Sequence, residues 1–271
     1  MHSPIPKMIP AADGGEAYEI VAGEIASGTI ILADHASNAM PPEFEALGLP
    51  AAELERHIGY DIGVAALTRA LAARLSAPAV LSRFSRLLID PNRGDDDPTL
   101  VMRLSDGAIV PGNADLDEAG VTQRMQRFSL PYHAAIASVI DRMLAAGMVP
   151  AVVSIHSFTP QMKGVERPWH VGILWDNDPR LALPLLELLQ ADASIITGDN
   201  EPYDGALEGD TMTRHCIRRG LPHVLIEVRQ DLIATQADAI RWGERLAGDL
   251  RPLLERPAMH EIRHFGSRAT R

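Results

Sequence analysis

Cysteine is almost absent from this chain of 271 residues, in which Cys216 stands alone. One cysteine can form no disulfide within the chain and cannot build a cysteine-based zinc site. A lone thiol can act as a nucleophile, but a small core or surface residue is the simpler interpretation of Cys216. The sequence therefore excludes a disulfide-stabilised scaffold.

Aromatic residues and basic charge are also scarce. Aromatic side chains make up 4% of the residues and apolar residues 46%, so a sizeable core must be built from Ala, Leu, Ile and Val. The formal net charge of -11 argues against a general nucleic-acid or membrane-surface binder, because no basic excess is available to neutralise phosphates. A local basic pocket for a small anion is compatible with this charge.

Long apolar runs and several well-known active-site motifs are missing as well. No segment approaches the roughly 18 apolar residues needed to span a bilayer, and residues 1–15 lack the apolar core of a signal peptide. The chain has no glycine-rich phosphate loop, no Gly-x-Ser-x-Gly turn and no His-Glu-x-x-His helix. We therefore expect a soluble cytoplasmic protein with a different kind of site.

Strand-like and helix-like segments alternate along the chain. Strands are predicted at 17–21, 28–33, 79–82, 87–90, 151–155, 171–175, 195–198 and 223–228. Helices are predicted at 61–75, 122–146, 181–190, 212–219 and 234–254. This alternation favours an α/β fold around a doubly wound, largely parallel or mixed sheet. Residues 1–16 are expected to form an irregular arm, residues 17–271 a single domain, and residues 95–120 a long loop or lid.

Two predicted strands each deliver a histidine that is followed by a serine and then a proline. His35 follows the apolar run 29–32, and His156 follows the run 151–155. Neutral imidazole is the commonest metal ligand, and a catalytic zinc ion takes three protein ligands plus an open position. We interpret the two residues as ligands of one metal ion; the alternative is a polar histidine bonded to a nearby carbonyl.

The third ligand is open to three alternatives. Asn38 lies three residues after His35, but an amide is a poorer zinc ligand than a carboxylate. Asp61, at the start of the first strong helix, is the better candidate, although it could instead cap that helix. His57 is a further candidate, and Asp34 could orient a ligand by a hydrogen bond.

Glu227 stands inside an otherwise apolar strand. Burying a bare charge is expensive, so this residue must be paired, protonated or catalytic. Near a metal-activated water it could act as a general base. The alternative is an ion pair with Arg214 or with Arg229, which strand alternation places on the same face. We favour the general base.

Cationic side chains could bind a substrate carboxylate. Asn92 and Arg93 follow a predicted strand and combine a forked guanidinium with an amide donor. Arg214 and His215 offer a second cation beside a proton donor. Surface arginines are often merely solvated, so each is weak evidence alone. Further substrate-binding candidates are Arg86, Asn38 and Tyr203.

These motifs, in this order, resemble the N-formylglutamate amidohydrolase family. The shared segments are Asp34-His35-Ala36-Ser37-Asn38, Ser85-Arg86 with Asp90-Pro91-Asn92-Arg93, Ile155-His156-Ser157, Thr213-Arg214-His215 and Ile226-Glu227. Each is short, but together they are fairly specific and span about residues 30–233.

The resemblance implies a fold and a chemistry. The fold is a three-layer α/β/α sandwich of the phosphorylase/hydrolase-like kind, related to the zinc carboxypeptidases. The reaction is zinc-dependent hydrolysis of N-formyl-L-glutamate to formate and L-glutamate, in histidine breakdown. The family's metal-ligand histidines match His35 and His156, its catalytic glutamate matches Glu227, and its carboxylate-binding pair matches Asn92 and Arg93. Asn38 stands where the carboxypeptidase pattern has glutamate. The form Asp34-His35-Ala36-Ser37-Asn38 resembles a branch of the family distinct from the plain histidine-pathway enzymes.

Together these inferences predict one Zn²⁺ per chain, held by His35, His156 and Asp61. Glu227 would pass a proton from water to the leaving amine, while Arg214 or His215 stabilises the oxyanion. The expected partner is a small anionic N-acyl amino acid, and the alanine-rich helices could form a homodimer face. Two alternatives stay open. One is a metal-dependent amidase acting on another N-acyl amino acid or on a cell-wall or peptide fragment, and the other is a non-catalytic small-acid binding protein of the same fold.

Overall fold

The computed structural model describes residues 7–269. Its strands are β1 Met8–Ile9, β2 Ala12–Asp13, β3 Tyr18–Val21, β4 Gly23–Glu24, β5 Thr29–Ala33, β6 Ala79–Ser82, β7 Leu104–Ser105, β8 Ala108–Ile109, β9 Ala151–Phe158, β10 Gln161–Met162, β11 Val165–Glu166, β12 Val171–Leu174, β13 Thr197–Asp199 and β14 His223–Arg229. Its helices are α1 Ala51–Leu54, α2 Val64–Leu75, α3 Pro111–Ala114, α4 Glu118–Arg124, α5 Leu130–Ala145, α6 Pro179–Gln190, α7 Thr211–His215 and α8 Gln236–Leu254. None of the helices in this range combines the length and the apolar character that crossing a membrane requires.

Eight strands form one mixed sheet in the order β13-β12-β14-β9-β5-β6-β3-β2. The central strands β14, β9, β5 and β6 run parallel, whereas β12 is antiparallel to β14 and β3 is antiparallel to β6. The parallel strands are buried almost throughout, because helices cover both faces, and this burial explains their continuous apolar runs. The predicted α/β fold with a mixed, largely parallel sheet is confirmed.

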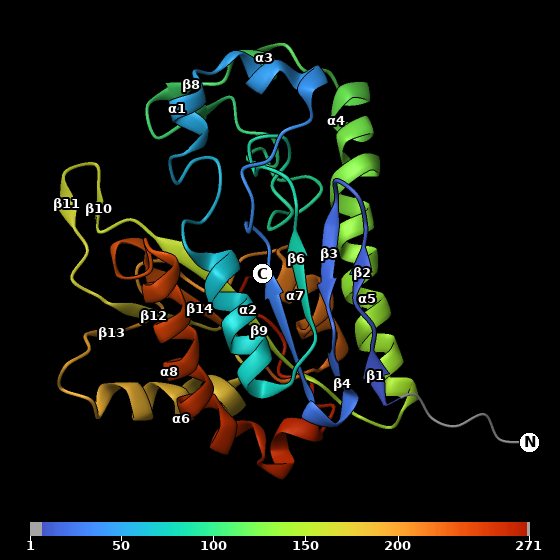
Figure 1. The fold of residues 1–271 in the computed structure, drawn as a ribbon, viewed down its shortest axis with the longest axis vertical. Helices are drawn as coiled ribbons and strands as arrows, with labels where there is room; N and C mark the ends of the chain where they lie inside the picture. Colours follow the sequence, from blue (N-terminus) through green and yellow to red (C-terminus); the bar gives the residue numbers. More distant parts are fainter. Residues whose placement is uncertain (1–6, 270–271) are drawn as a thin grey trace, which may run out of the picture.

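Helices on both faces make the fold a three-layer sandwich. Figure 1 shows α2 and α8 side by side against one face of the sheet. They share a core with α6 and with strand residues such as Ile31 and Val153. Helix α5 packs on the opposite face, against residues such as Leu32. Gly243 lets α8 approach α2 closely, since a Cβ there would lie 2.8 Å from the carbonyl oxygen of Leu67.

Several segments differ from the sequence-based expectation. Residues 87–90 belong to a turn and the irregular chain that follows it, not to a strand. Side chains replace a strand partner there, since Asn113 donates to the carbonyl oxygen of Leu87 at 2.9 Å and Arg124 donates to that of Leu88 at 2.9 Å. The expected loop at 95–120 contains the β7–β8 hairpin, α3 and the start of α4, and a π-helical turn at Met125–Ser129 interrupts the helix expected at 122–146. Residues 1–6 of the expected irregular arm lie outside the described residues, and residues 7–16 contribute β1 and β2 to strand pairs.

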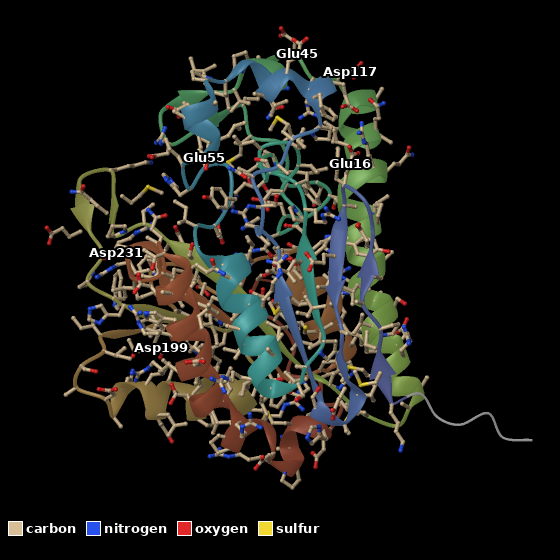
Figure 2. The ribbon with its side chains drawn as sticks, viewed as in Figure 1. Glu16, Glu45, Glu55, Asp117, Asp199 and Asp231 are labelled. Atoms are coloured by element: carbon tan, nitrogen blue, oxygen red, sulfur yellow. The ribbon has the colours of Figure 1, made fainter. Side chains whose placement is uncertain are left out.

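The surface acids labelled in Figure 2 are distributed over the molecule. Glu16, Glu45, Glu55, Asp117, Asp199 and Asp231 project from elements on different sides of the molecule. These acids contribute to the formal net charge of -11.

The carboxyl ends of β5, β9 and β14 meet at one edge of the sheet, because the three strands are parallel neighbours. Glu227 on β14 lies in register with His156 on β9. The segments that include α1, α3 and β8 lie at this end of the molecule in Figure 1. In open α/β sheets, ligands bind at this edge.

Candidate metal centre and active site

His35, Asp61 and His156 come together at the carboxyl edge of the sheet. His35 follows the end of β5, His156 lies within β9, and Asp61 belongs to the segment between α1 and α2. Asp61 Oδ2 lies 3.4 Å from His35 Nδ1 and 3.0 Å from His156 Nδ1. The three potential ligand atoms lie within 4.8 Å of one another and form a buried group that could hold a metal ion.

A further carboxylate fixes the far side of each imidazole. His35 Nε2 lies 2.7 Å from Asp90 Oδ1, and His156 Nε2 lies 3.1 Å from Asp34 Oδ2. An ionised carboxylate can only accept a hydrogen bond, so each Nε2 carries a proton and Nδ1 is the nitrogen that can bind a metal. Such carboxylate–histidine pairs are typical of metal-binding histidines.

Asp34 is held in place by two hydroxyl groups. Tyr132 Oη donates to its Oδ1 at 2.9 Å, and Thr211 Oγ1 donates to the same oxygen at 2.8 Å. Burial alone would raise the pKa of Asp34, but the hydrogen bond and charge of His156 outweigh burial and lower the pKa to about 2. Asp34 thus stays ionised and orients His156. The corresponding role of Asp90, which holds His35, was not predicted from the sequence, although an acid at the end of the apolar run 87–89 is a signal for it.

Arg86 balances the charge of these carboxylates. Its Nε and Nη2 donate to Asp90 Oδ2 at 3.2 and 2.7 Å, and its Nη1 donates to Asp61 Oδ1 at 3.3 Å. Burial alone would raise the pKa of Asp90, but the charges of Arg86 and His35 lower it well below its usual range. Because this guanidinium already bonds to two buried carboxylates, its role is to hold the residues of the metal-binding group in place.

His156 lies between two carboxylates that favour its protonated form. Burial alone would lower the pKa of His156, but its hydrogen bonds to Asp34 and Asp61 raise it well above the usual range. Burial alone would raise the pKa of Asp61, but the charge of His35 and the hydrogen bond of His156 lower it. A proton on His156 Nδ1 therefore competes with a metal, and metal binding would release it.

Glu227 lies beside this centre. It is 6% exposed, and its Oε2 is buried without a hydrogen-bond partner among the described residues. Burial raises the pKa of Glu227 to about 7, although the charge of His156 opposes the rise. The alternative ion pairs do not form, because Arg229 and Arg214 pair with other acids. A buried carboxylate with a raised pKa and a free oxygen is suited to accept a proton.

A cavity of about 590 Å³ opens onto these groups. Its lining brings together most of the expected site residues, namely His35, Asp61, Arg86, Asn92, Arg93, His156, Tyr203 and Glu227. Asn38, Arg214 and His215 are not part of this lining. Their side chains are engaged elsewhere, because Asn38 donates to the carbonyl oxygen of Leu54, Arg214 pairs with Asp95 and His215 bonds to His133.

The structure separates the three alternatives for the third ligand. Asp61 lies between the two histidines, whereas Asn38 lies outside the cavity. His57 lines the cavity but lies outside the metal group, with its Nε2 3.5 Å from Asp106 Oδ2. Geometry therefore favours Asp61.

The family model of the N-formylglutamate amidohydrolases matches residues 27–234 of the chain. The protein belongs to this family. The matched residues include the metal-binding group and Glu227, and membership makes the protein an amide hydrolase. The resemblance inferred from the motifs is thereby confirmed.

Two solved structures are similar to this amidohydrolase. The gene product Atu2144 from Agrobacterium tumefaciens is 36% identical, with 89% of this chain and 94% of that chain covered and a TM-score of 0.79. An N-formylglutamate amidohydrolase from Ralstonia eutropha JMP134 is 21% identical, with 91% and 98% covered and a TM-score of 0.63, which shows a shared fold. No curated protein matches the chain.

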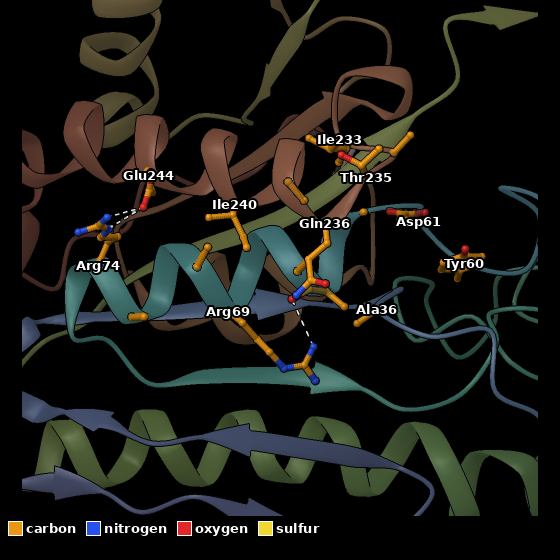
Figure 3. A pocket seen from close by; sticks show the side chains of 17 residues that line it. Ala36, Tyr60, Asp61, Arg69, Arg74, Ile233, Thr235, Gln236, Ile240 and Glu244 are labelled. Atoms are coloured by element: carbon orange, nitrogen blue, oxygen red, sulfur yellow. Dashed lines mark hydrogen bonds and ion pairs between the residues drawn. The ribbon is translucent and has the colours of Figure 1, made fainter.

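A second cavity of the amidohydrolase, about 670 Å³, lies between α2 and α8 (Figure 3). Alanine is the most frequent residue of its lining, which also includes Ile233 and Ile240, and an ion pair between Arg74 and Glu244 lies at one end. It shares only Asp61 with the metal-binding group and contains no histidine. Despite its larger volume, it is not the candidate active site.

His133 on α5 and His215 on α7 form a buried pair outside the cavity lining. His215 Nε2 lies 3.0 Å from His133 Nδ1, and His133 Nε2 donates to the carbonyl oxygen of Pro91 at 3.0 Å. Burial lowers the pKa of His133 to about 4 and that of His215 to about 3. His215 is therefore neutral at pH 7 and cannot supply the cation expected there.

This pair should make the fold sensitive to acid. The unfolded chain takes up protons on both residues near pH 6.5, whereas the folded chain does so only near pH 4 or below. Between these pH values the unfolded state binds more protons than the folded state. The free energy of unfolding therefore falls by about 1.4 kcal/mol for each histidine and each pH unit as the pH is lowered. The free energy of unfolding is measured in urea at pH 7.5 and at pH 5. Between these two pH values, His215→Gln should lose about 2 kcal/mol less of it than the wild type. Equal losses would contradict this account.

Proposed function

We propose that the protein hydrolyses N-formyl-L-glutamate to formate and L-glutamate, with Zn²⁺ held by His35, Asp61 and His156. The observation that carries the proposal is the place of Glu227, a buried carboxylate of raised pKa beside a buried metal-binding group in one cavity. The family match supports the choice of substrate.

The donor set suits zinc. Catalytic zinc sites commonly use three protein ligands drawn from imidazole nitrogens and a carboxylate oxygen. Carboxylates hold both imidazoles, and Glu227 Oε2, which has no hydrogen-bond partner among the described residues, marks where a polar reactant would be accommodated. Zinc at this position would polarise the amide carbonyl and lower the pKa of a water molecule.

Glu227 carries the proton in this scheme. Its carboxylate accepts a proton from the attacking water and then donates it to the departing amine nitrogen. A pKa of about 7 keeps the two protonation states close in free energy at neutral pH, which suits a group that takes and returns a proton. Arg214 and His215 lie outside the cavity lining, so no oxyanion role is assigned to them.

Arg93 is placed to bind a substrate carboxylate. It lines the cavity, and its Nη1 and Nε donate to the carbonyl oxygen of Asn92 at 2.8 Å and to Thr99 Oγ1 at 3.1 Å, while no acid within residues 7–269 forms an ion pair with it. Its positive charge is therefore available, unlike that of Arg86. Asn92 Oδ1 accepts from the backbone N–H of Thr211 at 3.1 Å, which leaves its amide group as a donor.

Arg93→Ala is expected to raise KM for N-formyl-L-glutamate by about 10- to 100-fold, the usual range for losing hydrogen bonds to a charged group. The value of kcat should change little, because Arg93 lies outside the metal-binding group. Arg103→Ala is the matched control, since Arg103 is exposed in the loop that follows. An unchanged KM in Arg93→Ala would mean that another residue binds the carboxylate.

Hydrolysis assays test the function directly. Protein stripped by a chelator and reloaded with Zn²⁺ is assayed against N-formyl, N-formimino and N-acetyl amino acids. N-formyl-L-glutamate should show the highest kcat/KM, stripped protein should be inactive, and the loaded protein should hold one zinc per chain. Binding of the acids without hydrolysis under any metal condition would favour a non-catalytic binding protein.

The size of the cavity favours a small substrate. A volume of about 590 Å³ lies within the usual range for small-molecule sites, whereas a cell-wall or peptide amidase would need a long open groove. A role in histidine breakdown, a cytoplasmic location and a homodimer built on the alanine-rich helices remain predictions.

A further inference from the structure

One wall of the active-site cavity is formed by an irregular stretch of chain. Residues 200–207, here called the wall segment, connect β13 to α7 and contribute Tyr203, Asp204 and three more residues to the lining. The segment crosses the sheet beside Glu227. Gly172 pairs with Glu227, and a Cβ at Gly172 would lie 2.0 Å from the carbonyl oxygen of Glu201. Movement of the wall segment would therefore reshape one wall of the active-site cavity.

Asn200 attaches the wall segment to the end of β12. Its Oδ1 accepts from the backbone N–H of Trp175 at 2.9 Å and from that of Gly205 at 3.0 Å. The contact is close, because a Cβ at Gly205 would lie 2.2 Å from the Trp175 nitrogen. This attachment holds the backbone but does not engage the side chains that face the cavity.

Arg268 attaches the wall segment a second time, from near the other end of the sequence. Its Nη2 donates to Asp204 Oδ1 at 2.8 Å and its Nη1 donates to Asp204 Oδ2 at 3.2 Å, which makes a forked pair. Its Nη2 also donates to the carbonyl oxygen of Trp175 at 2.9 Å. Forked arginine–carboxylate pairs fix both partners in orientation.

A buried acid holds Arg268 in place. Asp176 is 3% exposed, and its Oδ1 accepts from the backbone N–H of Arg268 at 2.8 Å and lies 3.2 Å from the Arg268 Nε. Its other oxygen is buried without a partner among the described residues. Leaving a buried carboxylate without its cation is costly, so the guanidinium stays at this position. An ordinary surface ion pair has no such anchor and contributes little.

We propose that Arg268 is a positioning residue, which acts through Asp204 to hold the wall segment in place for substrate binding. Its kinetic consequence rests on the proposed function. Its contacts lie on the wall segment and the end of β12, whereas His35, Asp61, His156 and Glu227 come from elsewhere in the fold. Arg268 therefore affects substrate affinity and not the chemical step. It also lies beyond residue 234, where the family match ends.

Steady-state kinetics of the zinc-loaded protein test the kinetic part. Arg268→Ala should raise KM for N-formyl-L-glutamate about five- to tenfold with kcat within about twofold, since KM and kcat separate binding from chemistry. Arg268→Lys should restore part of the affinity, because it keeps the charge but not the fork. Adding Asp204→Ala to Arg268→Ala should raise KM no further, as expected of residues that act as one unit. Unchanged kinetics, or a loss of kcat at constant KM, would overturn the proposal.

Arg241→Ala is the matched control, because Arg241 is an exposed arginine that pairs with Asp238 on α8. It should leave both kinetic constants unchanged.

Hydrogen exchange tests the positioning without any substrate. In Arg268→Ala, the backbone amides of residues 200–207 other than Pro202 should exchange faster than in wild type, while those of β9 and β14 keep their protection. Unchanged exchange in the wall segment overturns the positioning role. A wild-type protein that hydrolyses nothing overturns only the proposed function, so the two failures are distinguishable.

Discussion

Glu227→Gln is expected to lower kcat by about 10²- to 10⁴-fold, the usual contribution of a general base, while metal binding and folding are retained. Glutamine keeps the size of the side chain but cannot accept a proton. Glu227 is outside the His35–Asp61–His156 group, so zinc content should stay the same. The check is kcat of the zinc-loaded variant together with its metal content and thermal unfolding.

The matched control is Glu187→Gln, which removes an exposed carboxylate on α6 and should leave kcat unchanged. Full turnover in Glu227→Gln would assign the proton transfer to another residue. A loss of turnover together with loss of zinc would instead mean that Glu227 supports the metal.

The pH dependence of kcat/KM tests the same role of Glu227 in a second way. Protonated Glu227 cannot act as a base, and burial raises its pKa to about 7. A metal cation beside it would stabilise the carboxylate and lower that pKa, so the acid limb of kcat/KM should lie no higher than about pH 7. An acid limb of kcat/KM whose midpoint lies well above pH 7 would contradict the assignment.

Asp61→Asn is expected to weaken zinc binding by more than about 100-fold, the upper range for residues that only support a ligand. Asp61 Oδ2 faces the Nδ1 atoms of both histidines, and an amide is a weaker ligand than a carboxylate. Arg86 keeps Asp90 as a partner, so the variant should still fold. The measurement is zinc per chain after dialysis against a graded zinc buffer.

Asn38→Ala and His57→Ala are the controls for this experiment, because the sequence left both residues open as ligands. Asn38 lies outside the cavity lining and His57 lies beside Asp106, so both variants should keep one zinc per chain. If His57→Ala loses zinc while Asp61→Asn retains it, the ligand set derived from the geometry is wrong.

The elements that position the site were readable from local pattern. Apolar runs that are buried on both faces identified β5, β9 and β14, and helical periodicity identified α2 and α8. His35, His156 and Glu227 were visible because each is a polar residue at the end of, or inside, such a run. The turn at 87–90 was mistaken for a strand, because its apolar residues are buried by side-chain contacts rather than by strand pairing.

The sequence by itself thus determined the α/β class, the family and the two histidines. Only the tertiary structure decided the partners of the polar side chains. Asp61 bonds to His156, which lies 95 positions further along the sequence, and Asp34 bonds to Thr211, which lies 177 positions further along. The tertiary structure also places Asp90 against His35 and Arg86 against two carboxylates. It engages the side chains of Asn38, Arg214 and His215 outside the cavity lining. The physical reason is that apolar burial repeats with the local period of a helix or strand, whereas a buried polar group is satisfied by whatever partner the fold brings near it.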